Sequence, residues 1–134
     1  MSDDSNTPNN ADKNRGVAGR PVAPDQVSRL RNLCGGPRDG ALLRFSLGNA
    51  LLAAGHFADA ATELRRAVDF DPNYSAAWKL LGRALVEAGD AALARQAWSE
   101  GMAAAQRAGD VQARKEMQVF LKRLDKPGGS AKRD

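Results

Sequence analysis

The chain has 134 residues and one cysteine, Cys34, so it has room for a single domain, cannot form an intramolecular disulfide, and is expected to keep a buried or half-buried thiol. Its 20 Lys and Arg against 16 Asp and Glu give a formal net charge of +4, but both signs are interleaved along the predicted helices, as at Glu63 and Arg66, which indicates a mixed, solvated surface. No run of 18 apolar residues and no basic start followed by an apolar stretch occurs, so we predict neither a membrane span nor a secretion signal and expect a cytoplasmic protein.

The first segment with helical periodicity follows a polar start. Residues 1–23 consist mainly of Ser, Asn, Asp, Pro, Gly and balanced charges. Such a segment buries too little apolar surface to offset its ordering entropy, so we expect a disordered tail. Residues 24–35 carry Val27, Leu30 and Leu33 at spacings of three, which predicts a helix.

A repeat of 34 residues occupies the middle of the chain. When residues 41–74 are shifted onto residues 75–108, identical small or apolar residues coincide. The coinciding pairs are Leu47 and Leu81, Gly48 and Gly82, Ala50 and Ala84, Leu51 and Leu85, Ala54 and Ala88, Gly55 and Gly89, Ala58 and Ala92, and Ala60 and Ala94. Because Ala and Leu dominate here and β-branched residues are few, both units are predicted to be helical.

Two glycines lie inside the predicted helices at equivalent points of the repeat. A glycine in mid-helix costs about 1 kcal/mol relative to Ala. Gly48 and Gly82 therefore indicate that a neighbouring helix passes too close for a β-carbon, and Ala60 and Ala94 are the residues expected to face them.

A second pair of glycines predicts the turns within each unit. Gly55 and Gly89 follow apolar helical patterns and should end the first helix of each unit with positive φ. Short loops then force antiparallel hairpins. Asp71, Pro72 and Asn73 break the chain between the units, because Pro cannot continue a helix and Asp and Asn favour turns.

One further helix is predicted after the repeats. Asp110 is a good N-cap for residues 110–124. The apolar stripe of this helix consists of Ala113, Met117, Phe120, Leu121 and Leu124. Residues 126–134 contain Pro127 and two glycines and are expected to form a disordered basic tail.

The spacing of the repeats resembles the tetratricopeptide-repeat (TPR) family. In the second unit, the family's Trp, Leu-Gly, Ala and aromatic positions are occupied by Trp78, Leu81, Gly82, Ala94 and Trp98. The first unit matches the pattern at Leu47, Gly48, Ala60 and Pro72. It departs from the pattern at Arg44, which stands in place of the Trp. In the second unit, Gly101 stands where the family pattern has a later Ala. The resemblance implies an all-α fold: a short right-handed solenoid of about six helices, with a half-repeat at 24–35, repeats at 41–74 and 75–108, and a capping helix at 110–124.

No arrangement of residues for catalysis, cofactor binding or metal binding is visible. His56 is the only histidine and lies in a predicted turn, with no second His or Cys to complete a metal site. The serines have no partners that suggest a nucleophile. We therefore expect a protein that is not an enzyme and that has no cofactor, no metal and no small-molecule substrate.

The family resemblance implies a concave groove lined by the first helix of each hairpin. Transferred to this chain, that face selects Phe45, Asn49, Leu52, Lys79, Arg83, Val86 and Arg114. Apolar groups and an amide at one end and cations at the other indicate a protein segment with a hydrophobic anchor and acidic groups or a C-terminal carboxylate. The alternative is that the apolar members pack between hairpins and that Lys79 and Arg83 are ordinary exposed charges. Only Asn49 and Arg114 match the carboxylate-binding set of chaperone adaptors.

Two other functions remain open at this point. The end helices of a truncated solenoid can pair between copies, which would make the chain a self-assembly module. Nucleic-acid binding is a third interpretation, and its candidate residues are Arg29, Arg31, Arg38, Arg44, Lys122 and Arg123, together with the basic tail. No membrane partner is expected.

Overall fold

The structure is a computed structural model that describes residues 22–126, with side chains from residue 26 onward. Residues 1–21 and 127–134, which make up most of the predicted tails at 1–23 and 126–134, lie outside the described residues. The helices are α1 (Val22–Leu33), α2 (Ala41–Ala53), α3 (Phe57–Phe70), α4 (Ser75–Glu87), α5 (Ala91–Ala108) and α6 (Val111–Asp125). No strand occurs between residues 22 and 126. The predicted all-α class is confirmed.

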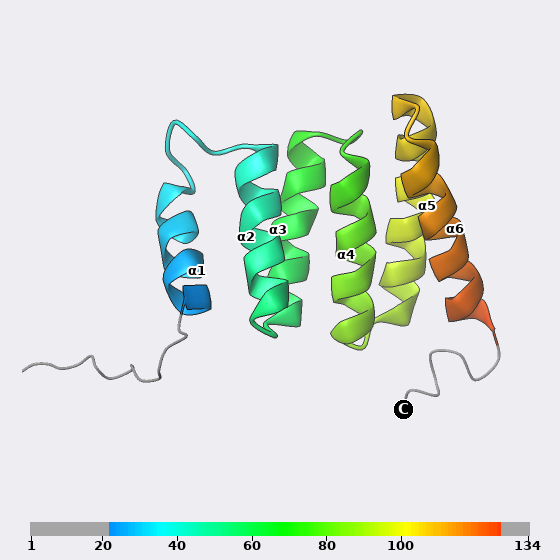
Figure 1. The fold of residues 1–134 in the computed structure, drawn as a ribbon, viewed down its shortest axis with the longest axis horizontal. Coiled ribbons are helices and arrows are strands. Elements are labelled where there is room, and N and C mark those ends of the chain that lie inside the picture. Colours follow the sequence, from blue (N-terminus) through cyan, green and yellow to red (C-terminus); the bar gives the residue numbers. More distant parts are fainter. Residues whose placement is uncertain (1–21, 127–134) are drawn as a thin grey trace, which may run out of the picture.

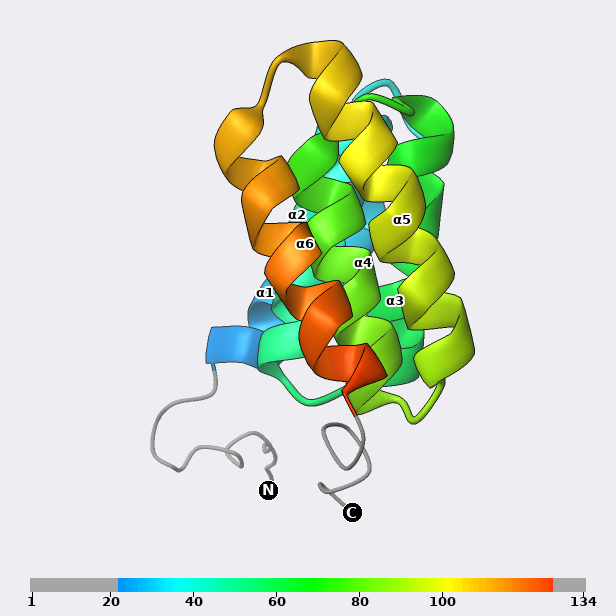
Figure 2. The same ribbon diagram turned by 90° about the vertical axis from the view of Figure 1, so that its right-hand side faces the viewer.

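The helices stand side by side and alternate in direction, so that each pair forms an antiparallel hairpin (Figure 1). Seen from the C-terminal side, α2, α4 and α6 lie in one layer, and α3 and α5 lie in the other (Figure 2). We call the outer surface of α2, α4 and α6 the first-helix face. α2 packs on α3, α3 on α4, α4 on α5, and α5 on α6, which is the stacking expected of a solenoid.

α1 begins at Val22, two residues before the predicted start at Pro24. The early start is physically allowed, because the first N–H groups of a helix have no intrahelical partner and Pro24 lies within this first turn. Residues 22 and 23 therefore belong to the helix and not to the tail. α1 ends at Leu33, and Gly35 follows with φ of 83°.

The turns inside the two hairpins have the predicted geometry. Gly55 and Gly89 have φ of 85° and 89°. The N–H of His56 donates to the carbonyl of Leu51 at 2.9 Å, and the N–H of Asp90 donates to the carbonyl of Leu85 at 2.8 Å. These bonds satisfy carbonyl groups left over at the helix ends, so equivalent sequences close both hairpins in the same way.

The close approach predicted at Gly48 and Gly82 is also present. A β-carbon on Gly48 would lie 2.5 Å from Cγ of Leu64, and one on Gly82 would lie 2.1 Å from Nε1 of Trp98. The side chain nearest to each glycine is therefore not the predicted Ala60 or Ala94 but the residue one helical turn later, Leu64 or Trp98. Each glycine makes room for a large side chain from the following helix.

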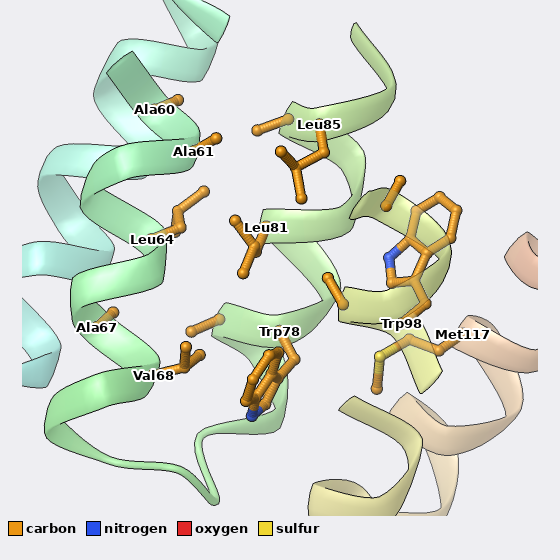
Figure 3. Packing of buried hydrophobic residues seen from close by; sticks show 14 of the residues in the cluster. Ala60, Ala61, Leu64, Ala67, Val68, Trp78, Leu81, Leu85, Trp98 and Met117 are labelled. Atoms are coloured by element: carbon orange, nitrogen blue, oxygen red, sulfur yellow. The ribbon is translucent and has the colours of Figure 1, made fainter. Parts of the chain in front are cut away.

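The core runs continuously through the stack (Figure 3). Leu64 and Leu81 are almost completely buried between α3 and α4. The apolar stripe predicted for α6 faces this core, with Met117 fully buried. A β-carbon on Gly101 would lie 2.6 Å from both Met117 Sδ and Trp78 Cβ, which explains why glycine stands there instead of Ala.

Glu63 departs from the expected solvated surface, since it is only 4 % exposed. Nη1 of Arg44 lies 2.7 Å from its carboxylate, and Arg66 contributes a second contact at 3.1 Å. Arg44 also binds Asp39 at 2.8 Å. A buried carboxylate needs such partners because its desolvation is costly.

Candidate functional site

A hollow lies on the first-helix face between α4 and α6. Its volume is about 450 Å³, within the range of ligand pockets. The residues that line it are Lys79, Leu80, Arg83, Glu116, Val119, Phe120 and Arg123. We call it the α4–α6 hollow.

The apolar side of the hollow is held in place from the core. Phe120 and Leu80 are half-buried, and the Phe120 ring packs against the Trp98 ring with centroids 5.1 Å apart. Trp98 is fixed in turn, because its Nε1 donates to the backbone carbonyl of Lys79 at 3.0 Å. The Trp98 ring, which packs at Gly82, therefore holds Phe120 in position at the hollow.

The polar side combines three cations with one carboxylate. Lys79 Nζ donates to Glu116 Oε1 at 2.5 Å, and Gln112 donates to Oε2 at 3.1 Å. Both contacts lower the pKa of Glu116, and that with Lys79 has the larger effect. Among residues 26–126, no carboxylate oxygen lies within 4.0 Å of the guanidinium nitrogens of Arg83 or Arg123. These two groups can accept an anionic ligand.

The predicted groove residues divide between this hollow and other places. Lys79 and Arg83 line the hollow. Phe45 packs against Tyr74 with ring centroids 5.0 Å apart. Leu52 and Val86 are half-buried against the core, as the packing alternative predicted for the apolar members.

The remaining two predicted groove residues do not line the hollow either. Asn49 is exposed on α2. Arg114 lines a smaller hollow of about 220 Å³ at the turn between α5 and α6, next to Asp110. Asp110 caps α6 by accepting from the N–H of Ala113 at 3.0 Å, and it accepts from the Ser75 hydroxyl at 2.6 Å. The Ser75 bond is the main cause of its lowered pKa.

Several residues of the hollow were not among the predicted groove residues, although Arg123 was a candidate for nucleic-acid binding. They are Leu80, Glu116, Val119, Phe120 and Arg123. The 34-residue shift moves Lys79 and Arg83 onto Ala113 and Met117, which are both buried, so α6 does not keep the register of the repeats. The spacing along α6 could have predicted this part of the hollow. Val119 and Arg123 lie three and seven residues after Glu116, so the three side chains share one face of the helix.

Two of the arginines considered for nucleic-acid binding are tied to Glu63. Arg44 makes the close ion pair, and a nitrogen of Arg31 lies 3.8 Å from the same carboxylate. His56 is exposed in its turn, and Cys34 is half-buried, with its thiol 3.6 Å from the Leu30 carbonyl. Between residues 22 and 126, no helix is long and apolar enough to cross a membrane.

Comparisons with known proteins agree with the repeat architecture. The sequence model of the tetratricopeptide-repeat family matches residues 51–115. The TPR repeat-containing protein PA0015 of Pseudomonas aeruginosa is 58 % identical over 88 residues, which is 66 % of this chain and 84 % of that protein. The solution structure of protein BPP2914 from Bordetella parapertussis has 49 % sequence identity and a TM-score of 0.65, covering 76 % of this chain and 89 % of that one.

Proposed function

We propose, from the premise that the chain belongs to the tetratricopeptide-repeat family, that its α4–α6 hollow binds a segment of another protein. Such repeats generally mediate protein–protein interactions, and proteins of this family are generally scaffolds without enzymatic activity. The proposal is that the chain acts as an adaptor that holds a partner against its first-helix face.

One observation carries this proposal: an apolar surface lies in the same hollow as two guanidinium groups that have no carboxylate partner among residues 26–126. Leu80, Val119 and Phe120 offer a surface for one apolar anchor. Arg83 and Arg123 lie beside them, and arginine binds carboxylates with two parallel hydrogen bonds. The chemistry fits a segment that carries an apolar side chain next to acidic groups.

A peptide array tests this proposal. The array holds twelve-residue peptides with one Leu or Phe at varied distance from Asp residues, and a second copy has Asn at every Asp. We expect binding to peptides of the first copy only. Isothermal titration calorimetry then measures the affinity of the strongest binder for the protein and its variants.

Charge reversal of the two arginines identifies the site. Arg83→Glu with Arg123→Glu should weaken binding at least about tenfold, since each lost charge-assisted contact is worth more than 1 kcal/mol. The matched control reverses Arg29 and Arg38, which are exposed and lie outside the hollow, and should change the affinity less than twofold. Equal losses in both pairs would show that the partner responds only to net charge.

A further inference from the structure

The Lys79–Glu116 ion pair bridges the α4–α6 hollow from one helix to the other. α4 and α6 run in the same direction (Figures 1 and 2), so the bridge lies nearer their N-terminal ends than Arg83 and Arg123 do. The two side chains are 34 % and 36 % exposed. Solvent and ligands can therefore reach the pair.

Glu116 already provides the interaction that an acidic ligand would make with Lys79. Its Oε1 accepts from the ammonium group, and its Oε2 accepts from Gln112 one turn earlier on α6. The lysine ammonium is a compact charge on a flexible stem with three donors. It can exchange one carboxylate for another with little change in interaction energy, because both partners are of the same chemical class.

We propose that Glu116 is a built-in competitor for the acidic group of the partner: it occupies Lys79 in the free protein and yields this lysine when a second ligand carboxylate enters the hollow. This inference rests on the proposed function and specifies its ligand. A segment with one carboxylate binds at Arg83 and Arg123. A segment with two carboxylates beside its apolar anchor also displaces Glu116, so Glu116 sets how acidic a partner must be.

The distribution of charge in the hollow supports a ligand with more than one carboxylate. The lining contains three cationic groups and one anionic group. After Lys79 and Glu116 neutralise each other, two positive charges remain. When a ligand carboxylate replaces Glu116, Lys79 still has an anionic partner, and the ligand keeps its contacts with the two arginines.

The test compares two single substitutions that each remove one negative charge from α6. Glu116→Gln opens Lys79 and keeps the size of the side chain. Asp125→Asn is the matched control, because Asp125 pairs with Arg95 at 2.7 Å and does not line the hollow. The probes are acetylated twelve-residue peptides of Ala and Ser that carry one Leu followed by either two Asp or one Asp.

Isothermal titration calorimetry should show that Glu116→Gln binds the two-Asp peptide about fivefold more tightly than the unaltered protein, the size expected when a partly exposed ion pair no longer competes. Its gain for the one-Asp peptide should be smaller, and Asp125→Asn should stay within about twofold for both. Thermal melting of each variant verifies folding, and Glu116→Ala serves as a second variant.

The failures of the two proposals are distinguishable. If the unaltered protein binds the peptides but Glu116→Gln and Glu116→Ala gain no more than Asp125→Asn, Glu116 is a structural link between α4 and α6, and the inference is overturned alone. If neither the unaltered protein nor any variant binds either peptide, both the inference and the proposed acidic ligand are wrong.

Discussion

The two repeats use different chemistry at the same place in the fold. Arg44 and Trp78 are 34 residues apart and stand at equivalent positions of α2 and α4, and their neighbours Glu63 and Ala97 are likewise equivalent. In the first repeat the guanidinium and the carboxylate form an ion pair at 2.7 Å. In the second repeat an indole ring lies in the core and the equivalent of the carboxylate is a fully buried Ala.

Both solutions also tie the preceding turn to the helix. Arg44 binds Asp39 at 2.8 Å, and Trp78 Nε1 donates to the carbonyl of Pro72 at 2.8 Å. In both repeats, therefore, this position holds a large side chain with a polar end that reaches back five or six residues. Either chemistry works, provided that the residue in the following helix changes with it, because a buried carboxylate requires its cation.

The largest expected effect comes from breaking the ion pair of the first repeat. Arg44→Met leaves Glu63 buried with only Arg66 and the more distant Arg31 as partners. It should lower the free energy of unfolding by about 3 kcal/mol, the lower end of the range for a buried ion pair that loses one partner. Urea denaturation monitored by circular dichroism measures this loss.

The matched variant transfers the chemistry of the second repeat. Arg44→Trp with Glu63→Ala should unfold within about 1 kcal/mol of the unaltered protein, because apolar replacements of buried ion pairs are often neutral or stabilising. If the double variant is as unstable as Arg44→Met, the two repeats are not interchangeable at this position.

A smaller effect is expected at the glycine notches, and it should differ between the repeats. Gly82→Ala should cost about 2 kcal/mol, because its β-carbon would collide with the rigid, hydrogen-bonded ring of Trp98. Gly48→Ala should cost about 1 kcal/mol, because the Leu64 side chain can adjust and Ala favours a helix. Urea denaturation compares the two, and equal costs would contradict the role assigned to the indole.

The smallest expected effect is a dependence on pH that belongs to the first repeat. Arg44, and then the N–H of Gly35, hold the pKa of Asp39 well below its usual range. On acidification, Asp39 is therefore protonated in the unfolded chain before it is protonated in the folded one. The stabilisation that the Asp39 carboxylate provides is present above a pH of about 4 and is lost as the pH falls below that value. The equivalent residue of the second repeat is Asn73, which does not titrate.

Thermal melting between pH 6 and pH 3 tests this dependence. Asp39→Asn should lose less melting temperature on acidification than the unaltered protein does. Asp59→Asn, an exposed carboxylate on α3, is the control and should behave like the unaltered protein. A parallel loss in all three proteins would remove Asp39 as the source.

Local patterns in the amino-acid sequence were enough to predict the helices, their hairpin turns and their order. Gly55 and Gly89 predict their turns because a positive φ is a property of the local backbone. Asp110 and the apolar stripe ending at Leu124 predict α6 for similarly local reasons, since capping and periodicity act within a few residues. Gly48 and Gly82 reveal a close contact, although not which side chain makes it.

Which charges are buried and where the hollow lies could not be predicted from these local patterns, because both depend on how the helices pack. Glu63 looks like surface charge until Arg44, 19 residues earlier, is placed beside it. Lys79 and Glu116 meet across 37 residues, in a register that the 34-residue period does not predict for α6. Burial and ion pairing depend on distances between helices, and these distances are set by how the side chains of all the helices pack together.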